Sequence, residues 1–580
     1  MADYRAPVEA QMLALETAGD LGGLIGLPAF GALTIDLARA ILEESARLAE
    51  NGFGPLAAIG DREGATWKDG TVTLPEGFAA TYRDYVAGGW NGLAAGTAYG
   101  GQGLPFLLSI AVQEQLAAAN LAFSLNPMLT LGAIEALQVH GSDAQKALYL
   151  PRLISGEWTG TMNLTEPQAG SDVGALRTSA TPMPDGTYRI SGSKIFITWG
   201  EHDVAENIVH LVLARLPDAP PGTRGISLFL VPKFLPDADG KPGKRNDLRC
   251  VSIEHKLGIH ASPTCAMSYG DAGQCIGWII GPPHGGMRAM FTMMNNARVA
   301  VGLQGVAMAE RATQDARAYA QERVQAGPII AHPDVRRMLM TMMALTEAAR
   351  VLTYANAAAV DRAHAMPDET DRAFWLVRAS LLTPMTKAYA TDIGVEVSSL
   401  GIQVHGGMGY IEETGAARHY RDARIAPIYE GTNGIQALDL ANRKLRDDGG
   451  AAMQALEGEI AQFLAAETDA TFAGPLRRGL DVLAEACGQM LAHDPVSANA
   501  VATPFLRLAA SVVSGWLLAV QAREAAARLA NGSGDPAMLK ARIAVARFYL
   551  SDILPQSLAL GAVVAAGEGE LMSEAVLPLG

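Results

Sequence analysis

One block of the chain, from about residue 159 to residue 284, differs in texture from the sequence on either side of it. Short β-branched and aromatic runs recur there, at residues 208–213 and 226–231, and turn-forming residues separate them, as at 217–222. Runs of this length between Gly, Pro and Asp clusters are typical of short strands joined by tight loops. We therefore expect an antiparallel β domain, a small barrel, near the middle of the chain.

The segments that flank this block carry helical periodicity instead. Apolar residues three and four positions apart recur in residues 107–116 and again in residues 287–294. A chain of 580 residues is too long for one hydrophobic core. We predict a helical N-terminal domain at 1–158, the β middle domain at 159–284, a helical C-terminal domain at 285–446 and a helical extension at 447–580.

The charge balance argues against a nucleic-acid partner. The formal net charge is −15 and the isoelectric point is about 5.3, whereas proteins that bind nucleic acid usually present a basic face. A local basic pocket for a small anionic ligand remains compatible with this composition.

Cysteine usage and hydropathy set the expected compartment. The four cysteines are irregularly spaced, so we expect reduced thiols and no metal site. The first residues lack a basic leader followed by an apolar run, so we expect no secretory signal. The most apolar stretch of the extension, residues 508–520, is shorter than the roughly 20 residues of a membrane span, and we expect a buried helix there. The prediction is a cytoplasmic protein without a transmembrane segment.

Two segments at the β domain combine small, hydroxylated and aromatic residues. Residues 162–172 read MNLTEPQAGSD, and such residues let backbone amides approach a ligand while side chains add hydrogen-bond donors. Residues 194–200 read KIFITWG, and an aromatic beside a Thr on a strand can stack on, and hydrogen-bond to, a planar heterocycle. Taken alone, the first segment is more often an ordinary strand-to-loop turn, and the second is more often a core strand.

A third segment, QVHGGMGY at residues 403–410, offers glycine amides suited to a pyrophosphate. A helix end followed by a tight turn explains the same glycines. His405 has no partner His or Cys at ligand spacing, so we predict no metal role for it.

The fourth segment, residues 418–433, ends in Tyr429, Glu430, Gly431, Thr432 and Asn433. A carboxylate between an apolar turn and a glycine can be desolvated, and a desolvated carboxylate suits proton abstraction near neutral pH. Taken alone, Glu430 is more often a solvated loop carboxylate.

In their residues and in their order along the chain, these four segments resemble the acyl-CoA dehydrogenase family, over about residues 96–446. The resemblance implies an α+β fold with a helical N-terminal domain, a β-barrel middle domain and a helical-bundle C-terminal domain. It also implies that FAD binds between the middle and C-terminal domains at a subunit contact.

The resemblance assigns cofactor-binding roles to ten residues. Leu164, Thr165, Phe196 and Thr198 would line the flavin ring, and Phe196 stands where many relatives carry Trp. Arg323 would pair bidentately with the pyrophosphate bound by a neighbouring subunit. Gln325, Gln403, Gly406, Gly407 and Thr432 would complete the dinucleotide site, with Gln325 in place of the commoner Thr.

The resemblance also implies the reaction. Glu430 would remove the α-proton of an acyl-CoA thioester while the β-hydride passes to FAD, and electrons would leave to an electron-transferring flavoprotein. Ser171, Asn295 and Arg298 would bind the substrate. Asn295 replaces the acidic residue usual at that position, and Gly434 replaces a polar side chain of some relatives.

The ends of the chain are similar to those of the longer family members. In the longer relatives, a helical extension like the 130-residue one here covers the surface that tetrameric relatives use for assembly. This similarity implies a homodimer. The N-terminal segment 4–9 and the segment YEGTNGIQ are most similar to bacterial members acting on 3-(methylthio)propanoyl-CoA. The acyl chain itself is left open.

Three other readings stay open at this point. An acyl-CoA oxidase would reoxidise the flavin with oxygen, and flavin access decides that. A non-catalytic, flavin-containing DNA-binding relative would need a basic C-terminal domain, whereas residues 451–580 hold 8 Lys or Arg against 13 Asp or Glu. A degenerate structural subunit would have lost its base, whereas Glu430 is present.

Overall fold

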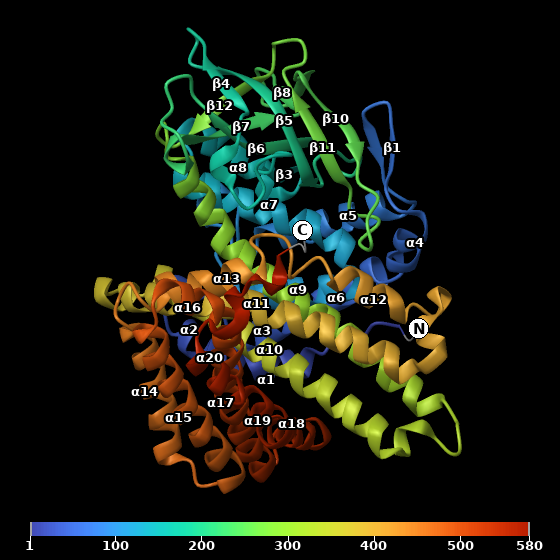
Figure 1. Cartoon of the computed structure of the whole chain (residues 1–580). Coiled ribbons are helices and arrows are strands. Elements are labelled where there is room, and N and C mark those ends of the chain that lie inside the picture. The colour runs from blue at the N-terminus through green and yellow to red at the C-terminus, as the bar shows by residue number, and fades with distance from the viewer. Residues whose placement is uncertain (1–2, 578–580) are drawn as a thin grey trace. The chain divides into compact units, whose positions relative to one another are not determined.

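The computed structural model describes residues 3–577, apart from the side chains of Met293, Asn295 and Val576. The chain divides into two compact units (Figure 1). The mixed unit comprises residues 3–6 and 43–300, and the helical unit comprises residues 7–42 and 301–577.

The N-terminal part of the mixed unit is helical, as predicted. Its helices are the second half of α3 (Ile35–Leu48), α4 (Leu56–Glu63), α5 (Phe78–Ala87), α6 (Phe106–Ala119), α7 (Leu121–His140) and α8 (Asp143–Ser155). A short antiparallel hairpin, β1 (Thr66–Lys68) and β2 (Thr71–Thr73), lies within this helical part. The helical prediction for residues 1–158 missed the hairpin, whose strands are only three residues long.

The rest of the mixed unit is the β domain. Its strands are β3 (Trp158–Asn163), β4 (Ser179–Pro182), β5 (Tyr188–Thr198), β6 (Asn207–Arg215), β7 (Ile226–Pro232), β10 (Leu248–Ile253), β11 (Thr264–Tyr269) and β12 (Ile276–Ile280), with a separate pair β8 (Phe234–Pro236) and β9 (Pro242–Arg245). The sheet order is β10-β11-β5-β12-β7-β6-β3, and β4 pairs with both β5 and β6. Strands β4, β5, β12, β7 and β6 therefore form a closed ring, which confirms the predicted barrel. Most pairs are antiparallel, but β6 pairs in parallel with β3 and β4, a departure from the purely antiparallel expectation.

Strand β3 is fixed against helix α7 by a close backbone approach. A Cβ added at Gly160 would lie 2.4 Å from the Cβ of Ala133 on α7. The Gly160 amide donates to Thr130 Oγ1 at 3.1 Å, so the contact is also hydrogen-bonded. This approach fixes the strand whose end leads into the TEPQAGSD segment.

The helical unit is built around three long helices. These are α9 (Gly286–Glu322, of which residues 301–322 belong to this unit), α10 (Pro333–Ala365) and α11 (Glu369–His405), with α1 (Val8–Glu16), α2 (Leu21–Ile25), α12 (Ala416–Ala423) and α13 (Asn433–Asp439) against them. Gly305 and Gly394 face one another where α9 crosses α11. A Cβ on Gly305 would lie 2.0 Å from the carbonyl oxygen of Ala390, so only glycine permits this crossing.

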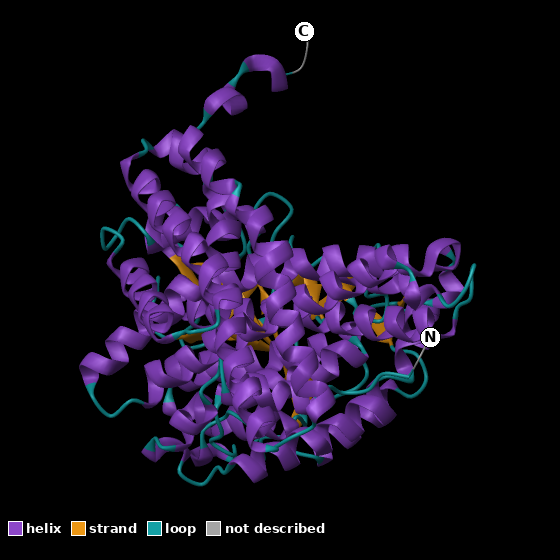
Figure 2. Cartoon of the chain, turned by 90° about the horizontal axis from the view of Figure 1, so that it is seen from below, coloured by secondary structure: helices purple, strands orange, loops and turns teal. Residues whose placement is uncertain are grey.

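The described part of the C-terminal extension consists of helices joined by turns, and helices also dominate the view in Figure 2. Its helices are α14 (Ala451–Ala466), α15 (Ala470–Ala492), α16 (Pro495–Ala500), α17 (Ala502–Asn531), α18 (Pro536–Phe548), α19 (Leu554–Leu558) and α20 (Leu560–Ala566). Buried polar contacts attach it to the long helices. Glu347 on α10 is fully buried and accepts from Gln521 at 2.8 Å and from Arg542 at 2.6 Å. Burial raises the pKa of Glu347, but Arg542 and Arg350 outweigh burial and lower it.

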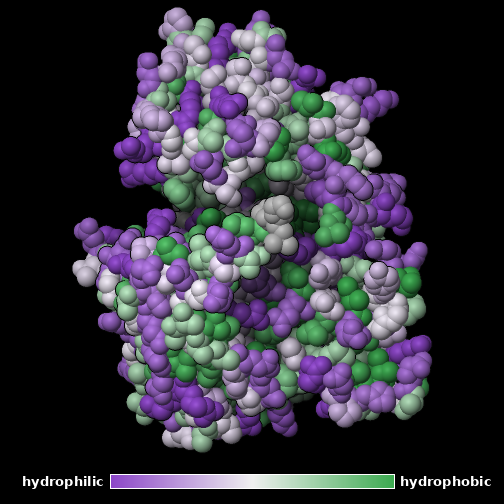
Figure 3. Space-filling model, in the orientation of Figure 1, coloured by the Kyte–Doolittle hydropathy of each residue, from purple (hydrophilic) through white to green (hydrophobic). Residues whose placement is uncertain are grey.

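Among the described residues, two helical stretches are long and apolar enough to cross a membrane by length and composition alone. The apolar window of Ala502–Asn531 is 83% buried within the protein, which fits the buried helix predicted for residues 508–520. The window within Pro536–Ala566 is 28% buried. One or two such helices are weak evidence for a span, and polar residues are spread over the whole face drawn in Figure 3.

Candidate active site

Glu430 lies in a strained loop between α12 and α13. The Asn433 amide donates to the Pro427 carbonyl at 3.0 Å and so closes the loop across its base. At the tip, Glu430 has φ +56° and Gly431 has φ +85°, so two consecutive residues are left-handed. A non-glycine residue in this region costs about 1–3 kcal/mol and persists only where its surroundings impose it. Strain of this kind is concentrated at functional sites.

Several contacts impose this loop conformation. Thr432 caps α13, because its Oγ1 accepts from the Ile435 amide at 3.2 Å. The Asn433 side chain binds α11, accepting from Lys387 Nζ at 2.8 Å and donating to Asp392 Oδ1 at 2.7 Å. Tyr429 donates to Gln304 on α9, and burial raises the pKa of this phenol, with the nearby Glu430 charge as a smaller cause.

The predicted pyrophosphate residues gather at the far end of α11. His405 stacks on Tyr319 of α9 with ring centroids 4.4 Å apart, which brings the ends of α9 and α11 together. Arg323, Gln325, Gln403, Gly406 and Gly407 lie at these two ends, and all five are exposed. His405 Nδ1 bonds to the Gly401 carbonyl at 2.7 Å, which gives this side chain a structural role.

Within the helical unit, these five residues are separated from Glu430 and Thr432. The Glu430 loop is attached to α11 at residues 387–392, whereas Gly406 follows its last residue. At 1.5 Å per residue, the two groups lie roughly 20 Å apart along the helix. The structure therefore brings the predicted residues of this unit together as two groups rather than one.

The predicted flavin-lining residues form a third group, in the mixed unit. Between Cys265 and Met267 the register of β11 against β5 shifts, so Ile195 and Phe196 together oppose one residue of β11. Phe196 has φ +59° and is 58% exposed at this bulge. A bulge re-aims a side chain, and here it turns an aromatic ring outward from the sheet. The Thr198 carbonyl accepts from Thr161 Oγ1 at 2.8 Å, which fixes the end of the strand.

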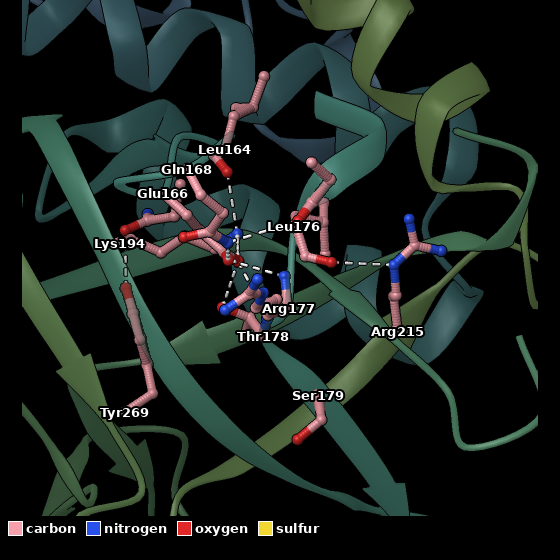
Figure 4. A network of polar contacts seen from close by, with 12 residues as sticks. Leu164, Glu166, Gln168, Leu176, Arg177, Thr178, Ser179, Lys194, Arg215 and Tyr269 are labelled. Carbon is pink, nitrogen blue, oxygen red and sulfur yellow. Dashed lines mark hydrogen bonds and ion pairs between the residues drawn. The ribbon is translucent and has the colours of Figure 1, made fainter. Parts of the chain in front are cut away.

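A buried ion pair holds the TEPQAGSD segment against β5 (Figure 4). Lys194 Nζ lies 2.8 Å from Glu166 Oε1 and donates to the Leu164 carbonyl at 2.9 Å. Glu166 also accepts from Thr178 Oγ1 at 2.6 Å and from the Arg177 amide at 2.7 Å. One buried carboxylate thus joins the two ends of the loop that carries Leu164, Thr165 and Ser171.

The pair is ionic at neutral pH. Burial raises the pKa of Glu166, but Lys194 and the hydrogen bonds outweigh burial and lower it to about 2. Burial lowers the pKa of Lys194 to about 8, although Glu166 opposes that shift. Both groups are therefore charged between these limits.

The predicted substrate residues are distributed over two elements. Ser171 is exposed in the loop after β3, and Arg298 is 7% exposed on α9. Asn295 also lies on α9, but its side chain is outside the described residues. Its neighbour Asn296 donates to Glu135 Oε2 at 2.5 Å, and burial raises the pKa of Glu135 to about 8.

Within each unit, the exposed groups have features that suit part of a dinucleotide. In the mixed unit, Phe196 offers an exposed aromatic face at the bulge of β5, two residues before Thr198. A Cβ added at Gly406 or Gly407 would meet nothing within 4 Å, so the backbone there is open to a phosphate. Among the described residues no group of three His, Cys, Asp or Glu side chains could hold a metal ion.

Four family models match consecutive parts of the chain. They describe the N-terminal, middle and C-terminal domains of acyl-CoA dehydrogenase, at residues 38–157, 161–272 and 284–445, and an acetyl-CoA dehydrogenase C-terminal-like domain at 456–574. A 3-methylmercaptopropionyl-CoA dehydrogenase of Ruegeria pomeroyi is 49% identical, over 95% of this chain and 96% of its own. The chain belongs to the acyl-CoA dehydrogenase family.

Other relatives agree with this assignment. A butyryl-CoA dehydrogenase of Syntrophomonas wolfei is 36% identical to this acyl-CoA dehydrogenase over 90% of each chain. Caenorhabditis elegans ACDH-11, solved with C11-CoA, has a TM-score of 0.76 at 21% identity, covering 95% of this chain and 92% of its own. An acyl-CoA dehydrogenase from Bacillus anthracis complexed with FAD has a TM-score of 0.75 at 20% identity, over 93% and 88%. Both structures support the fold. The predicted domain boundaries and site residues stay predictions.

Sequence reasoning singled out residues expected to contact ligands and missed the buried side chains that hold their loops. Lys194 and Glu166 lie inside the two quoted motifs, and Asn433 follows Thr432 directly, but none of the three was assigned a role. Lys387 lies outside every quoted segment. A lysine among the buried residues of an apolar helix is the signal that could have found it.

Proposed function

We propose that this acyl-CoA dehydrogenase carries FAD and uses Glu430 as the base that removes the substrate α-proton. The single observation that supports this role is the conformation of Glu430, a non-glycine residue at φ +56° in a loop bound to α11. The functional reading of such an outlier is that the chain holds a carboxylate in a fixed place despite strain.

The chain's residues divide the work. The Glu430 carboxylate would take the α-proton, and its backbone N–H would donate to the thioester carbonyl as charge develops there. One such donor is typically worth about 3–4 kcal/mol. FAD, when bound, supplies the acceptor for the β-hydride. Phe196, Thr198, Leu164 and Thr165 would hold the flavin ring.

The substrate we propose is 3-(methylthio)propanoyl-CoA. The support is the 49% identity to the Ruegeria pomeroyi dehydrogenase named for that thioester, along nearly the full length of both chains. The more distant Syntrophomonas wolfei relative is named for butyryl-CoA, whose chain is similar in length but lacks the sulfur. A short acyl-CoA is common to both.

The proposed electron acceptor is an electron-transferring flavoprotein, working with a homodimeric enzyme. One structural neighbour, at 27% identity and a TM-score of 0.60 over 71% of this chain, belongs to structural work on the electron-transferring flavoprotein of Acidaminococcus fermentans. To compare this acceptor with oxygen, oxygen consumption can be measured in parallel with reduction of an electron-transferring flavoprotein.

Anaerobic mixing of the FAD-loaded enzyme with a panel of acyl-CoAs tests the proposal. We expect flavin bleaching to be fastest with 3-(methylthio)propanoyl-CoA and slower with butyryl-CoA and octanoyl-CoA. Glu430→Gln should retain FAD and show no bleaching. Normal bleaching by that variant contradicts the assignment of the base, and a preference for octanoyl-CoA contradicts the proposed substrate.

A further inference from the structure

We infer that Asn433, seated on the buried Lys387, is a positioning residue that holds Glu430 in its reactive conformation. The inference rests on the proposed role of Glu430 as the base. Asn433 would act on the loop backbone, with no contact to the substrate.

The Asn433 side chain makes an unusually complete set of contacts with one segment of α11. Its Oδ1 accepts from Lys387 Nζ at 2.8 Å and from Thr391 Oγ1 at 3.3 Å. Its Nδ2 lies 2.7 Å from Asp392 Oδ1, 3.0 Å from Thr391 Oγ1 and 3.1 Å from the Ala388 carbonyl. Both ends of the amide are therefore satisfied, and a fully satisfied polar network favours a single geometry.

The backbone of Asn433 links this anchor to the loop. Its amide donates to the Pro427 carbonyl, so residues 427–433 form a ring closed at the anchored residue. Glu430 lies midway round that ring. Because Glu430, unlike Gly431, is strained at its left-handed φ, loosening of the base of the ring would let the Glu430 backbone relax.

Lys387 is the buried α11 residue that donates to the Asn433 side chain. Its side chain is fully buried, and a buried ammonium is costly unless its hydrogen bonds are satisfied. Asp392 lies in the same pocket, and burial raises its pKa while Asn433 and Lys387 oppose the shift. The amide of Asn433 lies between the cation and the carboxyl and bonds to both.

Loss of the anchor should affect chemistry more than binding. Displacing a reacting group by about 1 Å can cost about 100-fold in rate. We expect Asn433→Ala to lower the rate of flavin bleaching about 10- to 100-fold, with KM changed less than about threefold. The isotope effect with α-deuterated substrate should rise, because proton removal becomes more rate-limiting.

A matched control is available in the same unit. Asn442 in the turn Leu440–Lys444 bonds through its amide to Asn499 Oδ1 at 2.7 Å. Asn442→Ala should leave bleaching, KM and the isotope effect unchanged. If Asn433→Ala does not fold, Thr391→Val serves instead, because it removes one hydroxyl from the same anchor, and we expect a loss of about three- to tenfold in the bleaching rate.

The outcomes separate this inference from the proposed function. If Glu430→Gln is inactive while Asn433→Ala and Thr391→Val bleach at the wild-type rate, Glu430 stays the base and the positioning role is wrong. A fall in melting temperature and FAD content with an unchanged isotope effect also overturns it, since that is the signature of a merely structural side chain. Normal bleaching by Glu430→Gln overturns the base itself and the inference with it.

Discussion

Each unit of this acyl-CoA dehydrogenase contains a fully buried lysine that holds a loop of the predicted site, but the two lysines meet different partners. Lys194 of the mixed unit binds a carboxylate, Glu166, whose pKa is lowered to about 2. Lys387 of the helical unit binds a neutral amide, Asn433. The ion pair fixes a loop that would hold the cofactor, whereas the amide fixes a strained loop that would carry the base. We infer that the first contact matters more for stability and the second more for rate.

The largest effect should follow loss of the Lys194 ammonium. Lys194→Met leaves Glu166 charged, buried and without its ion-pair partner, and breaking a buried pair in this way typically costs about 3–5 kcal/mol. Denaturant unfolding and FAD content measure the loss. Lys244→Met, at an exposed lysine of the same domain, should change stability by less than about 0.5 kcal/mol. Equal stability of the two variants contradicts the role given to the pair.

Lys387→Met should be milder for stability and more harmful to rate. The partner left behind is a neutral amide whose oxygen keeps only the 3.3 Å hydrogen bond from Thr391 Oγ1, so the loss of stability should be at most about 1–3 kcal/mol. Because the same amide anchors the Glu430 loop, bleaching should slow about tenfold or more in folded, FAD-loaded protein. Stopped-flow flavin bleaching and denaturant unfolding of the two lysine variants, measured side by side, test whether Lys194→Met loses more stability and Lys387→Met loses more rate. A larger rate loss in folded Lys194→Met than in Lys387→Met contradicts the comparison.

The difference between local patterns and tertiary contacts determines which features the sequence could predict. Periodicity and turn residues were enough for the order of helical and β segments, because each segment follows its own local pattern. The hairpin at Thr66–Lys68 and Thr71–Thr73 escaped because three-residue strands carry almost no periodicity. The parallel pairing of β3 with β6 depends on residues about 50 positions apart, which no local pattern reports.

The candidate site shows the same difference between local motifs and tertiary contacts. The residues predicted to face a ligand were read from motifs in the sequence, and they stay predictions. The side chains that hold them are set by tertiary contacts, such as Lys387 with Asn433, 46 positions apart. The positive φ angles of Phe196 and Glu430 are likewise invisible in the residue letters, since neither is a glycine.

Acid should weaken the mixed unit through Glu166. Its pKa falls from a usual value of 4.5 to about 2 in the folded chain, because Lys194 and its hydrogen bonds outweigh burial. A carboxylate whose pKa is lowered by folding stabilises the fold at pH values above its unfolded pKa. That contribution is lost as the pH falls from about 4.5 toward 2. The difference in unfolding free energy between wild type and Glu166→Gln should shrink as the pH falls below about 5. A difference that stays constant down to pH 3 contradicts the ionic pair.

The smallest effect concerns the bulge on β5. Phe196 is left-handed and 58% exposed, so its ring contributes little to the core while its backbone is strained. Phe196→Gly relieves that strain and should raise the free energy of unfolding of the FAD-free protein by up to about 1 kcal/mol. The same change removes the aromatic face, so FAD should dissociate more readily, and Phe196→Trp should restore retention. Unfolding of the FAD-free protein and FAD release on dilution separate the two effects. A Gly variant that loses stability yet retains FAD would mean that the ring serves the fold, and would place Phe196 among the side chains that hold the site.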